Sequence, residues 1–178
     1  EESESAERLK SYSVDQVAKS LDDAIAATRE LLEGGSIGVI GSAHSSLEEQ
    51  YLLQKIVKHT NASFEMIQHT GEGDGLLMSE DRTPNLRGAL ITGLINQLPD
   101  TRLGQLKEAI EGGQIKTLLV FNEDLEQLGI DLGSLKDSVQ VIYFGSSKNS
   151  TSEQAKVIFP SLSVFEKDGT FVNQNFIL

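Results

Sequence analysis

The stretch Ser36-Ile37-Gly38-Val39-Ile40-Gly41-Ser42-Ala43-His44-Ser45-Ser46-Leu47-Glu48-Glu49 decides the fold class of this chain. It begins with an apolar run of strand length, continues through a turn of small residues, and opens a helix at Ser46. Ser46 and Glu49 match a capping box, in which each side chain bonds the backbone N–H of the other residue. Strand, turn and helix form the first half of a βαβ unit, whose ligands lie where strand ends meet helix starts. We therefore expect any ligand near residues 41–46, with Gly41, Ser42 and Ser46 as candidate binding residues.

The rest of the chain alternates apolar runs with helical patterns. Further strands are expected at residues 64–67, 115–121, 139–144 and 157–159, and helices at 46–59, 88–91, 102–110, 125–128, 132–136 and 150–153. Right-handed crossovers between such units produce a parallel sheet. The predicted fold class is therefore α/β: a Rossmann-like, doubly wound, mostly parallel sheet with helices on both faces, whose inner strands are 37–40, 118–121 and 141–144.

Local patterns predict the remaining segments. Ser13-Val14-Asp15-Gln16 matches a second capping box and predicts a helix from Val17 to Leu32. Residues 76–87 read as an extended segment that crosses the C-terminal edge of the sheet, and Asn85 is the expected cap of the helix after it. The pair Asp168-Gly169 predicts a hairpin between 164–165 and 170–172. We expect a polar lead-in at 1–12 and a single α/β domain at 13–178, and the initial Glu1 suggests a processed or excised segment.

Composition excludes several classes of function. The chain has 178 residues, which suits one core-bearing domain, and 27 acidic against 15 basic residues give a net charge of −12. Such a surface repels phosphate backbones, so we expect neither nucleic acid nor an anionic membrane as a partner. No apolar run reaches the length of a membrane span, so we expect no direct membrane insertion. The absence of cysteine excludes disulfides and thiolate-bound metal clusters within this chain.

Motifs for catalysis or metal binding are absent from the sequence. Gly38 and Gly41 do not have the G-x-G-x-x-G spacing of a dinucleotide site, so the turn is either a packing device or a helix-dipole anion site at Ser45 and Ser46. The three histidines at 44, 59 and 69 are too scattered for a metal-ligand pattern and are interpreted as surface or loop residues. The acid pairs at 80–81 and 123–124 read as solvated loop carboxylates. We therefore predict no catalytic residue and no metal ligand in this chain.

A resemblance adds what these patterns do not contain. It rests on segments 46–55 and 155–160, on Asp81-Arg82-Thr83-Pro84-Asn85-Leu86-Arg87-Gly88-Ala89, and on Glu166-Lys167-Asp168-Gly169-Thr170-Phe171-Val172-Asn173. In order and spacing these segments resemble the molybdopterin oxidoreductase family, over residues 35–175. The segment at 81–89 looks most like the large iron–sulfur subunits of NADH:quinone oxidoreductase (complex I).

The resemblance implies a domain that, in catalytic relatives, helps to hold one of two pterin-guanine dinucleotides. The metal ligand and the cluster cysteines of those relatives come from other domains. The family's Gly-Glu-Asn/Asp-Pro element appears here as Asn122-Glu123-Asp124-Leu125, which adds Glu123 and Asp124 to the candidate cofactor-binding residues. The chain departs from the family at Asn122 and Leu125, and also at Gly145 and Lys156. We therefore expect no cofactor in this domain, with molybdopterin guanine dinucleotide as the alternative.

These observations lead to one leading hypothesis and two rivals. The leading hypothesis is a structural, non-catalytic domain of the large iron–sulfur subunit of complex I, whose partners are the other domains and subunits of the complex. It implies a location on the cytoplasmic side of the membrane, in a peripheral arm. The first rival is a cofactor-binding domain of an active molybdenum or tungsten oxidoreductase such as a formate dehydrogenase. The second rival is a free-standing nucleotide-binding module.

Overall fold

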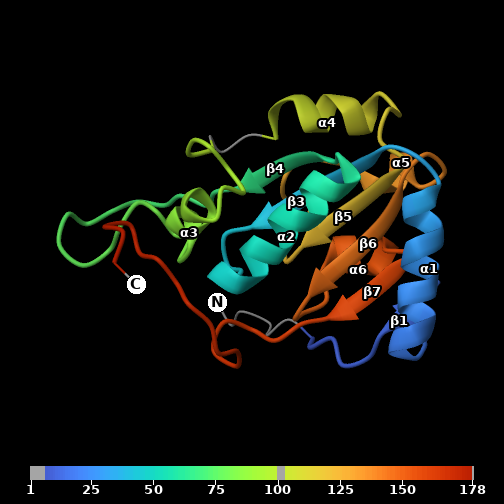
Figure 1. Cartoon of the computed structure of the whole chain (residues 1–178), viewed down its shortest axis with the longest axis horizontal. Coiled ribbons are helices and arrows are strands. Elements are labelled where there is room, and N and C mark those ends of the chain that lie inside the picture. The colour runs from blue at the N-terminus through green and yellow to red at the C-terminus, as the bar shows by residue number, and fades with distance from the viewer. Residues whose placement is uncertain (1–6, 100–102, 178) are drawn as a thin grey trace.

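The computed structural model describes residues 7–99 and 103–177, and within them the strands form one seven-stranded sheet in the order β2-β1-β7-β6-β5-β3-β4 (Figure 1). Its strands are β1 (Ser13–Val14), β2 (Val17–Ala18), β3 (Ile37–Ser42), β4 (Ser63–Ile67), β5 (Thr117–Phe121), β6 (Gln140–Gly145) and β7 (Val157–Pro160). Strands β3 to β7 are mutually parallel, whereas β1 runs antiparallel to both of its neighbours, β7 and β2. The predicted α/β fold with a mostly parallel sheet is confirmed.

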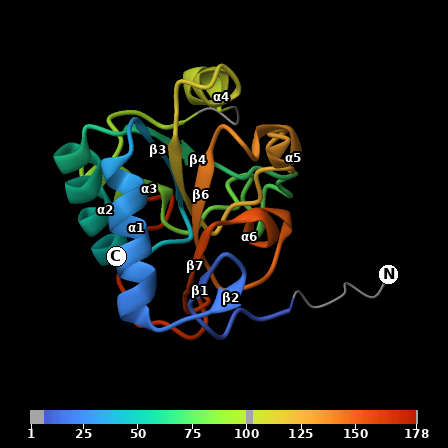
Figure 2. The same cartoon turned by 90° about the vertical axis from the view of Figure 1, so that its right-hand side faces the viewer.

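Helices cover both faces of this sheet, as predicted (Figure 2). The helices are α1 (Leu21–Glu33), α2 (Leu47–Thr60), α3 (Leu86–Ile91), α4 (Gly104–Glu111), α5 (Leu132–Leu135) and α6 (Ser150–Gln154). One core layer joins α1, α2 and α3 to side chains such as Val39, Leu119 and Ile142. The other joins α4 and α5 to side chains such as Leu118 and Val141. Successive residues of the inner strands enter opposite layers, which explains why those strands are apolar without alternation.

The strand order places a switch point between β3 and β5. From β3 the chain crosses to β4 on one side of the sheet, and the next strand, β5, pairs with the other side of β3. Ligands of doubly wound sheets bind outside the carboxyl ends of the strands at such a point. The fold therefore directs attention to the residues that follow Ser42 and Phe121.

Helix α2 has the predicted cap. The Ser46 hydroxyl accepts a hydrogen bond from the Glu49 N–H at 3.3 Å, and the Glu49 carboxylate accepts the Ser46 N–H at 2.7 Å. The helix ends at Asn61, whose φ of 52° is left-handed and is tolerated by asparagine.

The second predicted capping box is wrong. Ser13 lies in β1, and Asp15 and Gln16 adopt positive φ angles of 51° and 62°, which form the turn of a β1–β2 hairpin. Helix α1 begins later, where Ser20 and Asp23 form a capping box of their own. The hairpin pairs with β7 and so extends the sheet by two short antiparallel strands.

Other predictions are also corrected. Residues 125–128 form a turn rather than a helix, and the expected 164–172 hairpin is absent because neither flank forms a strand. Asn85 precedes α3, but its side chain makes no cap bond because it faces the interior. Helix α6 is capped by Asn149. Residues 76–81 belong to a folded-back loop rather than to an extended crossing segment.

The termini are described in part. Residues 1–6 of the expected lead-in, Arg102 of the predicted 102–110 helix, and Leu178 lie outside the described residues. Residues 7–12 pack along the loop after β6: the Leu9 N–H donates to the Ser146 carbonyl at 2.9 Å, and Leu9 is buried. No helix among residues 7–99 and 103–177 is long and apolar enough to cross a bilayer.

Candidate functional site

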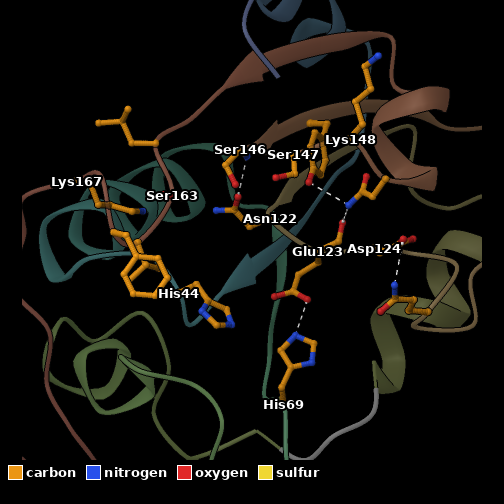
Figure 3. Close-up of a pocket in the computed structure, with 16 residues that line it drawn as sticks. His44, His69, Asn122, Glu123, Asp124, Ser146, Ser147, Lys148, Ser163 and Lys167 are labelled. Atoms are coloured by element: carbon orange, nitrogen blue, oxygen red, sulfur yellow. Dashed lines mark hydrogen bonds and ion pairs between the residues drawn. The ribbon is translucent and has the colours of Figure 1, made fainter. Parts of the chain in front are cut away.

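A crevice of about 580 Å³ opens at the switch point, beyond the carboxyl ends of the parallel strands (Figure 3). We call it the switch-point crevice. The loops after all five parallel strands contribute to it, because parallel strands place their following loops at one edge of the sheet. Its lining includes His44 after β3, His69 after β4, Asn122 to Asp124 after β5, Ser146 to Asn149 after β6, and Lys167 from the C-terminal segment.

Glu123 is the central acid of this crevice. Its side chain is only 3% exposed, and its Oε2 lies 2.8 Å from Nε2 of His69. Its other oxygen, Oε1, has no hydrogen-bond partner among the described residues. The bond to Glu123 raises the pKa of His69 above its usual value, against the opposing effect of burial. Glu123 therefore holds one acceptor for His69 and presents a second acceptor that a ligand could satisfy.

His44 completes the acid–base group. Its ring centroid is 6.1 Å from that of His69, and Figure 3 shows the Glu123 carboxylate close to both imidazoles. Burial lowers the pKa of His44, although the charge of Glu123 opposes that shift. The two histidines therefore differ in basicity: near neutral pH, His69 holds a proton more readily than His44.

Two asparagines position the β5 loop. Asn122 adopts a left-handed φ of 54°, donates its N–H to the Phe144 carbonyl at 2.7 Å, and accepts the Ser146 N–H at 3.3 Å. Asn149 donates through Nδ2 to the Glu123 carbonyl at 3.3 Å and to the Tyr143 hydroxyl at 3.0 Å. Burial raises the pKa of Tyr143 to about 12, so its phenol stays neutral. These bonds fix the backbone from which Glu123 projects.

Asp124 lines the crevice, but its carboxylate bonds neighbouring residues of the protein. It accepts hydrogen bonds from the Glu126 N–H at 3.1 Å and from the Ser150 hydroxyl. The next residue, Leu125, donates its N–H to the Thr151 hydroxyl at 2.8 Å. The β5 loop is therefore tied to the start of α6, and Asp124 contributes structure here.

The N-terminus of α2 is covered by the chain itself. The Glu48 carboxylate accepts the Thr170 N–H at 3.1 Å and its hydroxyl at 2.8 Å, which lowers the pKa of Glu48 to about 2. The Leu47 N–H donates to the Thr170 carbonyl at 2.8 Å. Lys167 pairs with Glu49 at 2.8 Å. The amides and positive dipole of this helix end are thus engaged by Glu48, Glu49 and the C-terminal segment.

The predicted site residues divide between two places. Glu123 and Asp124 line the crevice, whereas Gly41, Ser42 and Ser46 are buried and are not among its lining residues. A side chain at position 41 would meet the Phe64 ring at 2.9 Å, and Ser42 accepts the His44 N–H at 3.3 Å.

The sequence analysis does not identify two histidines of the crevice as site residues, because it interprets His44 and His69 only as surface or loop residues. Both lie in loops that line the crevice, and burial affects the pKa of each. Their shared position, two residues beyond a parallel strand, is the signal that could identify them.

Comparison with known families now places the chain. The model of the molybdopterin oxidoreductase family matches residues 24–177, which include every parallel strand and the whole crevice. The chain belongs to the molybdopterin oxidoreductase family. A comparison of this molybdopterin oxidoreductase domain with curated proteins finds no match. Within residues 7–99 and 103–177, no group of three or more His, Cys, Asp or Glu side chains is arranged to hold a metal ion.

Proposed function

We propose that this chain is a structural, non-catalytic domain of the large iron–sulfur subunit of an NADH:quinone oxidoreductase. In this proposal it packs against other domains and subunits of the peripheral arm on the cytoplasmic side of the membrane, and it binds no cofactor of its own. The segment at 81–89 supports the choice of subunit, because its sequence resembles those subunits most. The polar contacts of that segment and of the crevice support the structural role.

Within the segment at 81–89, Asn85 directs its side chain into the protein. Asn85 is fully buried: its Nδ2 donates to the Ser45 carbonyl at 2.7 Å, and its Oδ1 accepts the Val172 N–H at 2.7 Å. Its backbone N–H donates to the Ala43 carbonyl at 3.0 Å. Asn85 thus joins the turn after β3 to the C-terminal segment. A motif used in this way supports a role in architecture rather than in ligand binding.

The crevice suits the two ends of a pterin-guanine dinucleotide unequally. The free Oε1 of Glu123 is an acceptor that fits the N–H edge of a guanine. A pyrophosphate needs cations or free amides, but Lys148 pairs with Glu7 at 2.7 Å and Lys167 pairs with Glu49. The helix end that would bind it already holds Glu48. This self-pairing of the anion-binding groups is the observation that carries the structural proposal.

The second candidate function is a domain that does hold molybdopterin guanine dinucleotide, as in a catalytic molybdenum or tungsten enzyme. Glu123 favours it, because a buried acceptor without a partner is costly. When bound, that cofactor supplies the redox chemistry through its metal. This chain would then contribute the base contact at Glu123, with His44 and His69 beside it.

Calorimetry of the purified chain at low ionic strength separates the two candidates. Guanosine, guanosine diphosphate and NADH are titrated in turn. The structural proposal expects dissociation constants weaker than about 10 μM, or roughly −7 kcal/mol, for all three. Tighter binding of guanosine diphosphate that is lost in Glu123→Gln would favour the cofactor-holding candidate and overturn the structural one. Binding that survives Glu123→Gln would place the ligand elsewhere and would also contradict the structural proposal.

Membership of the complex needs a separate test. The full-length protein, tagged at its own locus, is purified from detergent-solubilised membranes of its source cell. We expect NADH oxidation coupled to quinone reduction to co-purify with the tag. Co-purification of molybdenum or tungsten with formate oxidation would instead identify the chain as part of a catalytic relative.

A further inference from the structure

Residues 70–81 form an ordered protrusion, here called the finger. Its two legs are joined by a bridge between Thr70 and Asp81 and by the Gly71 N–H, which donates to the Glu80 carbonyl at 2.9 Å. At its base, the Arg82 N–H donates to the His69 carbonyl at 3.0 Å. Figure 1 shows this loop, in green, extending beyond α3 and away from the sheet. The finger is therefore a hydrogen-bonded structure that stands out from the body of the domain.

One carboxylate shapes the tip of the finger. Oδ1 of Asp74 accepts the N–H groups of Leu76, Leu77 and Met78 at 2.9, 2.8 and 2.7 Å. The Asp74 N–H in turn donates to the Met78 carbonyl at 3.2 Å. A single acceptor thus fixes three consecutive backbone amides, and the tip has a defined conformation.

The side chains on this fixed tip are apolar and exposed to solvent. Leu76 is 85% exposed, Leu77 is 88% exposed, and Met78 is 51% exposed. A single exposed leucine is ordinary on a protein surface. Three consecutive apolar side chains at the end of an ordered protrusion are not, because burying them against a partner would release water from a continuous apolar surface. The tip has the character of the central anchor of an interface.

The flanks of the finger define the chemistry of the partner. Glu72 and Glu80 are exposed on either side of the tip, whereas the nearest cation, Arg82, donates to the Glu72 carbonyl at 2.6 Å. A second copy of this chain, with its own charge of −12, and an anionic membrane would both be repelled by these acids. A complementary partner has an apolar pocket with a basic rim.

We propose that the finger docks into another polypeptide, with Leu76, Leu77 and Met78 in an apolar pocket and Glu72 and Glu80 against Lys and Arg at its rim. The partner is a neighbouring domain or subunit of the same oxidoreductase, and that identification rests on the proposed function. The C-terminal segment braces the finger for this role, because the Ser79 hydroxyl donates a hydrogen bond to the side-chain oxygen of Gln174. A preorganised tip loses little conformational entropy on docking.

Site-specific photo-cross-linking in cells tests the contact. The full-length protein carries p-benzoylphenylalanine in place of Leu77 or, as a matched control, in place of Leu52, an exposed apolar residue of α2. After illumination, the cross-linked peptides are sequenced by mass spectrometry. We expect the residue-77 probe, and not the residue-52 probe, to label an apolar segment flanked by Lys or Arg. Cross-links to lipid, to a second copy of this chain, or no more cross-link than at position 52 would overturn the proposal.

Charge and apolar variants then measure the interaction. With the partner identified by the cross-link, Leu77→Asp should weaken complex formation at least about tenfold, while Leu52→Asp should not. Glu72→Lys with Glu80→Lys should weaken it too, and their effect should shrink at high salt. Equal loss in the Leu77 and Leu52 variants, or no effect of charge reversal, contradicts the proposal. A cross-linked partner outside any NADH:quinone oxidoreductase would refute the proposed function while leaving the docking contact standing.

Discussion

Replacement of Asn85 by alanine should remove the hydrogen bonds that hold the C-terminal segment against the rest of the domain. The asparagine side chain is fully buried and bonds the Ser45 carbonyl and the Val172 N–H, two groups that the chain brings together from positions 127 residues apart. Alanine can make neither bond. The variant therefore leaves a buried donor without a partner next to a buried turn.

The expected loss of stability depends on which buried groups keep a hydrogen-bond partner in the variant. The Ser45 carbonyl still accepts from Gln50 at 3.3 Å, so it loses only one of its two bonds, about 1 kcal/mol. Val172 is 1% exposed, and its N–H would be unsatisfied, which costs about 1–3 kcal/mol. The free energy of unfolding should therefore fall by about 2–4 kcal/mol.

Urea denaturation followed by far-UV circular dichroism measures this change, because the chain has no tryptophan to report by fluorescence. Hydrogen exchange at residues 170–173 localises it, and those amides should lose protection before the sheet does. Asn96→Ala, at an exposed asparagine, is the control and should change stability by less than about 0.5 kcal/mol. A loss below about 1 kcal/mol in Asn85→Ala, with Val172 still protected, would refute the reasoning.

Two further predictions concern the core and the crevice. Leu119→Ala should destabilise the domain by about 2–5 kcal/mol in urea melts, because Leu119 is buried between Val39 and Ile142 in the centre of the sheet; a loss below about 1 kcal/mol would place Leu119 outside the core. The pKa of His69 is raised in the folded protein, so its pair with Glu123 stabilises the fold only while His69 is protonated. This stabilisation is complete below about pH 6.5, the ordinary pKa of histidine, and is lost as the pH rises through the pKa of His69 in the folded protein. The stability gap between the wild-type chain and His69→Gln should therefore narrow as the pH rises from about 5 to about 9, and a constant gap would contradict the assigned pair. His44 acts in the opposite sense, since its lowered pKa favours the folded state at higher pH.

The parallel sheet could be predicted because each buried strand shows its own signal, a short apolar run, within a few consecutive residues. The runs around Val39, Leu119 and Ile142 are apolar at nearly every position, because a strand covered by helices on both faces buries every side chain. The start of α2 was also predictable, because Ser46 and Glu49 need only each other to form the cap.

The N-terminal hairpin was not predictable from the same kind of signal. Ser13 to Gln16 and Ser20 to Asp23 compete to start the first helix, and tertiary pairing decides between them. Ser13 and Val14 pair with β7, a strand more than 140 residues away, and this pairing commits the first segment to a sheet. The turn pair Asp15-Gln16 lacks the glycine of the Asn-Gly and Asp-Gly pairs that indicate a tight hairpin turn.

The crevice could be predicted only in part. Family resemblance indicates Glu123 and Asp124 as site residues, but the sequence does not show which of the two carboxylates is available to a ligand. The structure separates them, because Asp124 bonds Ser150 and the Glu126 N–H whereas Glu123 has a free oxygen. The pairing of His69 with Glu123 depends on the ends of β4 and β5 meeting across β3, which no local spacing encodes.

The covering of α2 by Thr170 has a consequence for synthesis of the protein. Glu48 and Thr170 are 122 positions apart, so at about 5–20 residues per second the ribosome adds Thr170 roughly 6–24 seconds after Glu48. Over that interval the Leu47 N–H and the Glu48 carboxylate lack their Thr170 partners. A nascent chain stopped before Thr170 already contains every strand of the sheet, yet it exposes the start of α2 and the buried face of Asn85. We therefore expect limited proteolysis of a chain truncated before Thr170 to cut at this corner before it cuts within the sheet.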